Sequence, residues 1–284
     1  MPILLFCCIL LTTVTQSAST KLYQRTAHDP AIFNACKACA ACLLFGLLCI
    51  GSFTFHLPTV LYGVIYGVLL CLSMHAGFRA LGLGPMSLTS LIVSFSIILP
   101  LLYGLIFCQE PFSLLKGLGL LALALAMVTA NLGKGHLAQQ KTDYPKWLFF
   151  LLLTFLSNGF CSILQKEHQR HYPGLYLPEF MLYAMLVCAI FFGAKTVLQS
   201  KQRKRGSLRG KRWGVLSGVT NGLANYCTLA LAGMENASVL FPAISAGTIL
   251  LSLLCGTVVF GERLKPPHWI ALITGIAAVV FLKL

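Results

Sequence analysis

The sequence predicts an all-α polytopic membrane protein, with ten transmembrane helices arranged as two inverted five-helix repeats. Three observations predict this fold class. The 284-residue chain is 57% hydrophobic and only 10% charged, whereas a soluble domain carries roughly 25% charged residues. Apolar segments of about 20 residues, long enough to cross a bilayer as a helix, recur along its whole length. Segments of the second half also resemble segments of the first half, in the same order.

Apolar runs place the expected spans at residues 2–20, 31–53, 57–80, 87–108, 113–132, 146–165, 178–198, 213–233, 237–260 and 267–284. Proline or glycine punctuates most of the joints, as at Pro30, Pro58 and Pro111. The connections are short except for residues 133–145 and 199–212. No segment remains that could fold as a separate soluble domain.

The first segment, "MPILLFCCILLTTVTQSASTKLYQR", has two interpretations, a cleaved signal peptide or the first span. A signal peptide normally begins with Lys or Arg, and the first 20 residues contain neither. Shifted by 145 residues, the segment also aligns with "FFLLLTFLSNGFCSILQKEHQR", so that Lys21 falls on Lys166. A leader has no reason to copy a later span, and we therefore interpret the segment as the first span.

The internal repeat continues through the later spans. A shift of 151 residues aligns Gly63 and Gly67 with Gly214 and Gly218, two small-xxx-small pairs that let helix backbones approach closely. A shift of 152 residues aligns "FCQEPF" with "VFGERL" and so Glu110 with Glu262. We predict a first repeat at 1–133, a connecting loop at 134–145 and a second repeat at 146–284. Because each repeat has five spans, the second enters the membrane inverted, as in many secondary transporters.

The cysteines and the acidic residues limit the chemistry. All twelve cysteines lie in apolar stretches, including the three of "CKACAAC", which could suggest a metal. No His or further Cys completes a tetrahedral set, so small apolar packing residues explain them better. We predict no metal, no cofactor and no disulfide framework. The seven acidic residues all lie in loops or at span ends, which leaves no mid-membrane carboxylate for proton coupling.

The segment "LFPAISAGTILLSLLCGTVVFGERLKPPHWIALITGIAAVV" (240–280) resembles the closing segment of EamA-type members of the drug/metabolite transporter superfamily. The resemblance covers nearly all of the chain and is strongest in residues 237–282. The first half departs from the family pattern, with Gln109–Glu110 in place of Gly–Glu and Lys37 where the family usually carries Arg. The resemblance implies a ten-helix bundle that exports small organic solutes. It also implies a cavity lined mainly by spans 1, 3, 4, 6, 8 and 9, and peripheral spans 5 and 10, where protomers could pair as a homodimer.

Polar side chains in these spans are candidates for substrate binding, because polar groups in lipid are costly and face a cavity or a partner helix. The candidates are Gln16, Tyr66, His75, Ser94, Asn158, Asn221, Asn225, Tyr226 and Ser245. Helix–helix packing is the alternative for each. His75 could instead titrate. Lys37, seven residues into span two, either snorkels to the interface or reaches the cavity and favours an anionic group.

Other residues are assigned structural roles. We expect Glu110 and Glu262 to cap or hinge their helices. Pro242 should kink span nine and free a backbone carbonyl. Gly63, Gly67, Gly214 and Gly218 should allow close helix packing.

Basic residues give the orientation. Most of the 21 Lys and Arg residues follow odd-numbered spans; the exceptions are Lys116, Lys166, Arg170 and Lys283. The positive-inside rule then places both termini outside the cytoplasm, whereas the family resemblance implies cytosolic termini. The run "KQRKRGSLRGKR" lies between two spans, where it serves as a topology anchor rather than a nucleic-acid site.

The function that follows is secondary active transport of amino acids, metabolites or drugs across the cell membrane, without ATP, because the sequence has no GxxxxGK loop. The expected partners are the lipid bilayer and a small-molecule substrate, and no nucleic acid. Alternatives with the same fold are a nucleotide-sugar or phosphorylated-metabolite antiporter, a lipid-linked flippase, and a non-transporting membrane partner. The sequence has no HExxH, GxSxG or paired mid-span carboxylates, which argues against an intramembrane enzyme.

Overall fold

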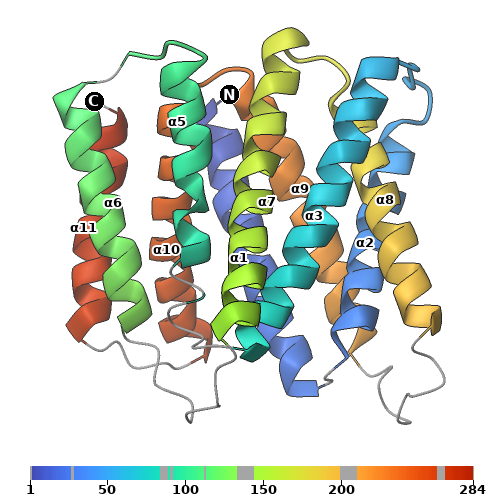
Figure 1. Cartoon of the computed structure of the whole chain (residues 1–284), viewed down its shortest axis with the longest axis horizontal. Helices are drawn as coiled ribbons and strands as arrows, with labels where there is room; N and C mark the ends of the chain where they lie inside the picture. Colours follow the sequence, from blue (N-terminus) through green and yellow to red (C-terminus); the bar gives the residue numbers. More distant parts are fainter. Residues whose placement is uncertain are drawn as a thin grey trace. The chain divides into compact units, whose positions relative to one another are not determined.

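The computed structural model describes residues 2–26, 29–83, 89, 92–111, 113–132, 144–198, 210–260 and 266–283. These residues are almost entirely helical and contain no strand. The helices are α1 (Pro2–Thr26), α2 (Pro30–Leu48), α3 (Leu57–Leu83), the 3₁₀ turn η1 (Phe95–Ile97), α5 (Ile98–Ile106), α6 (Leu114–Leu132), α7 (Tyr144–His171), α8 (Leu177–Leu198), α9 (Lys211–Ala232), α10 (Ala237–Phe260) and α11 (Pro266–Lys283) (Figure 1).

Hydropathy separates these helices into groups. Among the described residues, six helices (α1, α2, α3, α7, α8 and α10) are long and apolar enough to cross a membrane. Three shorter apolar helices span Ile92–Ile106, Leu114–Ala130 and Pro266–Leu282. The 22-residue α9 is long enough but more polar, because it begins with Lys211 and Arg212 and carries Asn221 and Asn225. The chain is therefore built as a polytopic membrane protein.

Two predicted span boundaries need correction. The second span was placed at 31–53, but α2 ends at Leu48 and turns follow, with Gly51 at φ 86°. A left-handed φ of this kind suits glycine and ends a helix. The fourth span is interrupted by the 3₁₀ turn Phe95–Ile97. Pro100 lacks the N–H that would bond to the carbonyl of Ser96, so the turn before it tightens.

Local signals define the start of α2. Asp29 is its N-cap, and its Oδ1 accepts hydrogen bonds from the backbone N–H of Ala31 (2.9 Å) and Ile32 (3.3 Å). Pro30 occupies the first helical position, where a missing N–H costs nothing. The Tyr23 hydroxyl donates to the Asp29 carbonyl oxygen at 2.8 Å, which ties the end of α1 to this cap.

The described helices group into two compact units. Unit 1 comprises residues 1–71 and 167–234, and unit 2 comprises residues 72–166 and 235–284. Each unit therefore takes helices from both halves of the sequence. The predicted division into repeats at 1–133 and 146–284 concerns similarity along the chain, and it stays a prediction.

Unit 1 is held by close helix approaches. In this unit α1 packs along α9, and α2 packs against both α8 and α9. A Cβ on Gly218 would lie 2.3 Å from the carbonyl oxygen of Lys37, and one on Gly214 would lie 2.9 Å from the Cβ of Cys36. A larger side chain at either position would hold α9 further from α2, so the two glycines set the α2–α9 spacing.

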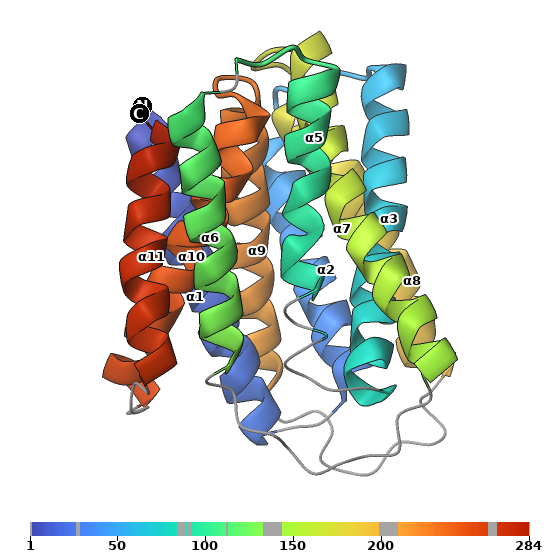
Figure 2. The ribbon, with the colours of Figure 1, turned by 60° about the vertical axis from the view of Figure 1, so that its left-hand side comes forward.

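Unit 2 is built around α10. This helix packs against α5, α6 and α11, and α6 packs along α11, so that α6, α10 and α11 stand together (Figure 2). The core between these three helices contains Leu123, Met127, Ala246 and Ala278. The alanines let the backbones approach while Leu123 and Met127 fill the remaining space.

Candidate functional site

Four of the predicted substrate-binding residues form one hydrogen-bonded chain in unit 1. The Nδ2 of Asn221 donates to the Oε1 of Gln16 at 3.3 Å. The Nδ2 of Asn225 donates to the carbonyl oxygen of Asn221 at 2.9 Å. The hydroxyl of Tyr66 donates to the Oδ1 of Asn225 at 2.8 Å. The chain therefore links α1, α9 and α3.

Helical periodicity explains why α9 is the centre of this chain. Asn221 and Asn225 are four residues apart, so their side chains lie on one face, one turn apart. Both are near the middle of α9, Gln16 is near the middle of α1, and all three are half-buried. Tyr66 is buried, and its ring meets that of Phe180 edge-on at 5.2 Å.

The chain leaves hydrogen-bonding capacity unused. Within the described part of the chain, no hydrogen bond uses the Nε2 of Gln16 or the Oδ1 of Asn221. One is a donor and the other an acceptor, and both belong to uncharged amides. The arrangement suits a small polar solute that can donate and accept at once, and it carries no charge of its own.

A further predicted residue, Asn158, is hydrogen-bonded in unit 2. The hydroxyl of Ser73 on α3 donates to the Oδ1 of Asn158 on α7 at 2.6 Å. One turn along α3, a Cβ on Gly77 would lie 3.2 Å from the Cγ2 of Thr154. This short bond ties α3 to α7, and it satisfies an amide that lipid would leave without a partner.

The remaining polar candidates lie outside these two groups. Tyr226 is half-buried beside Phe45, with 6.1 Å between ring centroids. His75, Ser94 and Ser245 are half-buried on α3, before η1 and on α10. Their role as substrate ligands stays a prediction.

Lys37 is buried inside unit 1. Its side chain is only 8% exposed, and α2 packs there against α8 and α9. Within the described residues, it has no ion pair with a carboxylate. Burying an ammonium group in this way is costly, and an anionic group beside Lys37 would offset that cost.

The predicted glycines occupy helix crossings in unit 1. Gly214 and Gly218 face α2, as described above. Gly63 and Gly67 on α3 face α8: a Cβ on Gly63 would lie 2.9 Å from the carbonyl oxygen of Phe180, and one on Gly67 would lie 2.7 Å from that of Ala184. Contact with a backbone oxygen leaves no room for any side chain at these positions.

Glu110 caps a helix that begins 127 residues later. Its two carboxylate oxygens accept hydrogen bonds from the backbone N–H of Ala237 (2.7 Å) and Ser238 (2.8 Å), the first residues of α10. Lys166 Nζ lies 3.8 Å from the same carboxylate and donates to the carbonyl oxygen of Glu235 at 2.6 Å. Negative charge at a helix N-terminus is stabilising. The predicted counterpart, Glu262, lies outside the described residues.

Pro242 is buried within the second turn of α10. Its ring nitrogen cannot donate to the carbonyl of Ser238, so that carbonyl loses its helical partner. Ser238 also has a buried hydroxyl with no partner among the described residues. In the first turn of α10, the N–H groups of Val239 and Leu240 donate to the carbonyl oxygen of Asn236, and Glu110 takes those of Ala237 and Ser238.

Sequence analysis missed a buried network at the end of α7. Gln169 Nε2 donates to His168 Nδ1 (3.0 Å), His168 Nε2 contacts Thr59 Oγ1 (3.1 Å), and Thr59 Oγ1 contacts His56 Nδ1 (2.9 Å). Because the amide group of Gln169 donates its hydrogen bond to Nδ1, Nδ1 is an acceptor, and the ring hydrogen of His168 is on Nε2. The network lies at the helix ends, which indicates a role in joining α3 to α7. The aromatic-rich run "HQRHYPGLY" (168–176) was the available signal.

Comparison with known proteins relates the chain to a known family. The profile of the EamA-like transporter family matches residues 145–284. The second half of the chain is therefore similar to EamA-like transporters. Members of this family are membrane transporters, and this likeness together with the six long apolar helices makes the chain an integral membrane protein.

Solved structures support the fold of this EamA-like chain over nearly its whole length. A crystal structure of a protein matches 98% of the chain with a TM-score of 0.80 and 15% identity, and the match covers 94% of that other chain. At this identity the likeness shows the fold alone. No curated protein matches the chain significantly.

Proposed function

We propose that this EamA-like chain is a secondary active transporter that exports small, uncharged or zwitterionic organic solutes through the cell membrane. Amino acids, related metabolites and drugs are the expected classes. The two inverted repeats would alternate access to a site near the midplane, as in other inverted-repeat transporters. No ATP-binding loop is present in the sequence, so an ion or solute gradient is the energy source.

The observation that carries this proposal is the Gln16–Asn221–Asn225–Tyr66 chain. It lies near the middle of α1 and α9, where a bilayer offers no water to satisfy amides. Its unused donor and acceptor are available to a solute, and its hydrogen bonds hold the amides in position before a solute arrives. Pre-positioned polar groups in an otherwise apolar setting are what a small-molecule site requires.

Flux through the purified protein tests the proposal. The full chain is reconstituted in liposomes, and uptake is screened against amino acids, nucleotide sugars and cationic drugs, with an imposed ion or solute gradient. We expect gradient-driven uptake of at least one uncharged or zwitterionic solute, and at least a tenfold loss in Asn221→Ala. The matched control is Thr228→Ala on the same helix, whose hydroxyl bonds only its own backbone at Ala224.

Two results would contradict the proposal. Uptake limited to nucleotide sugars would support the antiporter alternative, and no uptake of any class would support a non-transporting membrane partner. Equal uptake by Asn221→Ala and the wild type would remove the amide chain from the transport site while leaving transport itself intact.

A further inference from the structure

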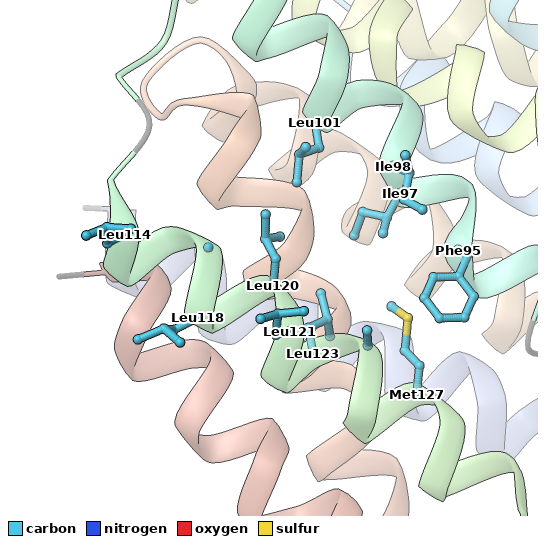
Figure 3. Close-up of a pocket in the computed structure, with 12 residues that line it drawn as sticks. Phe95, Ile97, Ile98, Leu101, Leu114, Leu118, Leu120, Leu121, Leu123 and Met127 are labelled. Atoms are coloured by element: carbon cyan, nitrogen blue, oxygen red, sulfur yellow. The ribbon is translucent and has the colours of Figure 1, made fainter.

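An apolar cavity of about 670 Å³ lies in unit 2 between the η1–α5 segment and α6 (Figure 3). Phe95, Ile97 and Leu101 form one wall, and α6 forms the other from Leu114 to Met127. None of the side chains that line it carries a polar or charged group. The cavity therefore offers nothing to bind a polar solute, and it is separate from the amide chain of unit 1.

The cavity opens to the lipid phase. Leu114, Leu118 and Leu121 on its α6 wall are 90%, 51% and 69% exposed. Both walls belong to apolar helices of membrane character, Ile92–Ile106 and Leu114–Ala130. Lipid surrounds such exposed leucines in a bilayer, so whatever fills the cavity arrives from the hydrocarbon region.

The length of the cavity suits an acyl chain. At about 1.5 Å per residue, the wall from Leu114 to Met127 is about 20 Å long. The hydrocarbon core of one lipid leaflet is about 15 Å deep. A chain that enters from the bilayer can therefore lie along the whole wall, in a cavity of about 670 Å³.

A positive charge lies at the Leu114 end of the cavity. Lys116, on the first turn of α6, is half-buried, and its Nζ donates to the carbonyl oxygen of Pro111 at 2.8 Å. The N-terminus of α6 adds the partial positive charge of a helix dipole. The carboxylate of Glu110 is engaged elsewhere, by the backbone N–H groups of Ala237 and Ser238 and by the ammonium group of Lys166.

We propose that the cavity between α5 and α6 is a binding site for one anionic phospholipid, with an acyl chain in the cavity and the phosphate at Lys116. The apolar walls recognise the acyl chain, and the lysine with the helix N-terminus recognises the headgroup. This site is independent of solute transport, since it shares no residue with the Gln16–Asn221–Asn225–Tyr66 chain.

Native mass spectrometry of the full chain in detergent tests the proposal, with dioleoylphosphatidylglycerol and dioleoylphosphatidylcholine added in equal amounts. We expect one retained phosphatidylglycerol per chain, at least fivefold over phosphatidylcholine. Ala124→Trp places a large ring in the cavity and should lower retention at least tenfold. Lys116→Gln should keep lipid binding but abolish the preference for phosphatidylglycerol. Leu125→Trp, one residue along α6 and outside the lining, is the matched control and should retain lipid as the wild type does.

A second measurement does not depend on filling the cavity. A variant whose only tryptophan is at Leu118 is titrated with brominated-tail phosphatidylglycerol in a phosphatidylcholine background. A specific site saturates the fluorescence quenching at a low mole fraction, whereas bulk lipid gives quenching that rises in proportion to mole fraction.

Three outcomes would overturn the proposal. The first is equal lipid retention by Ala124→Trp and Leu125→Trp together with proportional quenching. The second is equal retention of the two lipids by the wild type. The third is conversion of a dimer to a monomer by Ala124→Trp with lipid retention unchanged, which would assign the cavity to an interface between copies.

Discussion

The two units use different means to hold their helices. In unit 1, Gly214 and Gly218 bring α9 against the backbone of α2, and amides then bridge the helices at fixed positions. In unit 2, α6 presents leucines to α5 and leaves a cavity between them, while the carboxylate of Glu110 secures α10. Close backbone packing would position polar groups for the proposed solute, whereas looser packing of long side chains leaves room for the proposed lipid.

Among the predicted effects, glycine substitution should show the largest difference in stability loss between the two units. Gly218→Ala places a methyl group 2.3 Å from the Lys37 carbonyl oxygen, and backbone cannot move aside cheaply. We expect a loss of about 3–4 kcal/mol, at the upper end for single substitutions. In unit 2, Gly275→Ala meets only the side chain of Leu250, at 3.0 Å, which can rotate, so its effect should stay below about 1 kcal/mol. Thermal unfolding in detergent measures both, and equal losses would refute the contrast.

Removal of the Glu110 cap should have the next largest effect. Glu110→Ala leaves the backbone N–H groups of Ala237 and Ser238 buried without acceptors, which should cost about 2–3 kcal/mol. Glu110→Gln keeps one acceptor and should lose less. Glu167→Gln is the charge-matched control, because its ion pair with Arg170 is partly exposed and worth under about 0.5 kcal/mol. Unfolding in denaturant compares the three variants, and a Glu110→Ala loss no larger than that of the control would contradict the capping role.

The Tyr66–Asn225 hydrogen bond should contribute less than the cap. A double-mutant cycle with Tyr66→Phe and Asn225→Ala should give a coupling free energy of about 1 kcal/mol, the usual net value of a buried hydrogen bond. Stability in detergent is the measurement. A coupling near zero would mean that the two side chains are independent and that the amide chain is not held in place.

The smallest effect expected is a gain. Gln109 has φ 51° and is exposed, so its side chain strains the backbone without a packing contact. Gln109→Gly, which creates a Gly–Glu pair like that at residues 261–262 of the sequence, should stabilise the protein by about 0.5–1 kcal/mol. Tyr176 also has a positive φ of 54°, but its ring stacks on His56 at 4.4 Å, and Tyr176→Gly should destabilise. A gain in melting temperature for the second variant would show that strain outweighs stacking.

Most of the helices could be predicted from the sequence, because the length and hydropathy of a span are local properties. The errors lie where a single residue changes the backbone, as Gly51 does after α2 and Pro100 does in the first turn of α5. The polar candidates were also visible, because an amide such as Asn225 in an apolar run requires a partner. Which partner it finds was not visible. Nor was the network of His168 and Thr59, whose residues lie 109 positions apart.

The sequence by itself determined that this chain enters a membrane as a helical transporter-family protein, because burial in lipid requires long apolar helices wherever they lie along the chain. The tertiary structure alone decided that Glu110 caps α10, that Gly218 meets Lys37, and that Gln16 meets Asn221. Those contacts depend on which helix faces lie against each other. The packing of segments that are distant in the sequence decides which faces meet, and hydropathy does not indicate this packing.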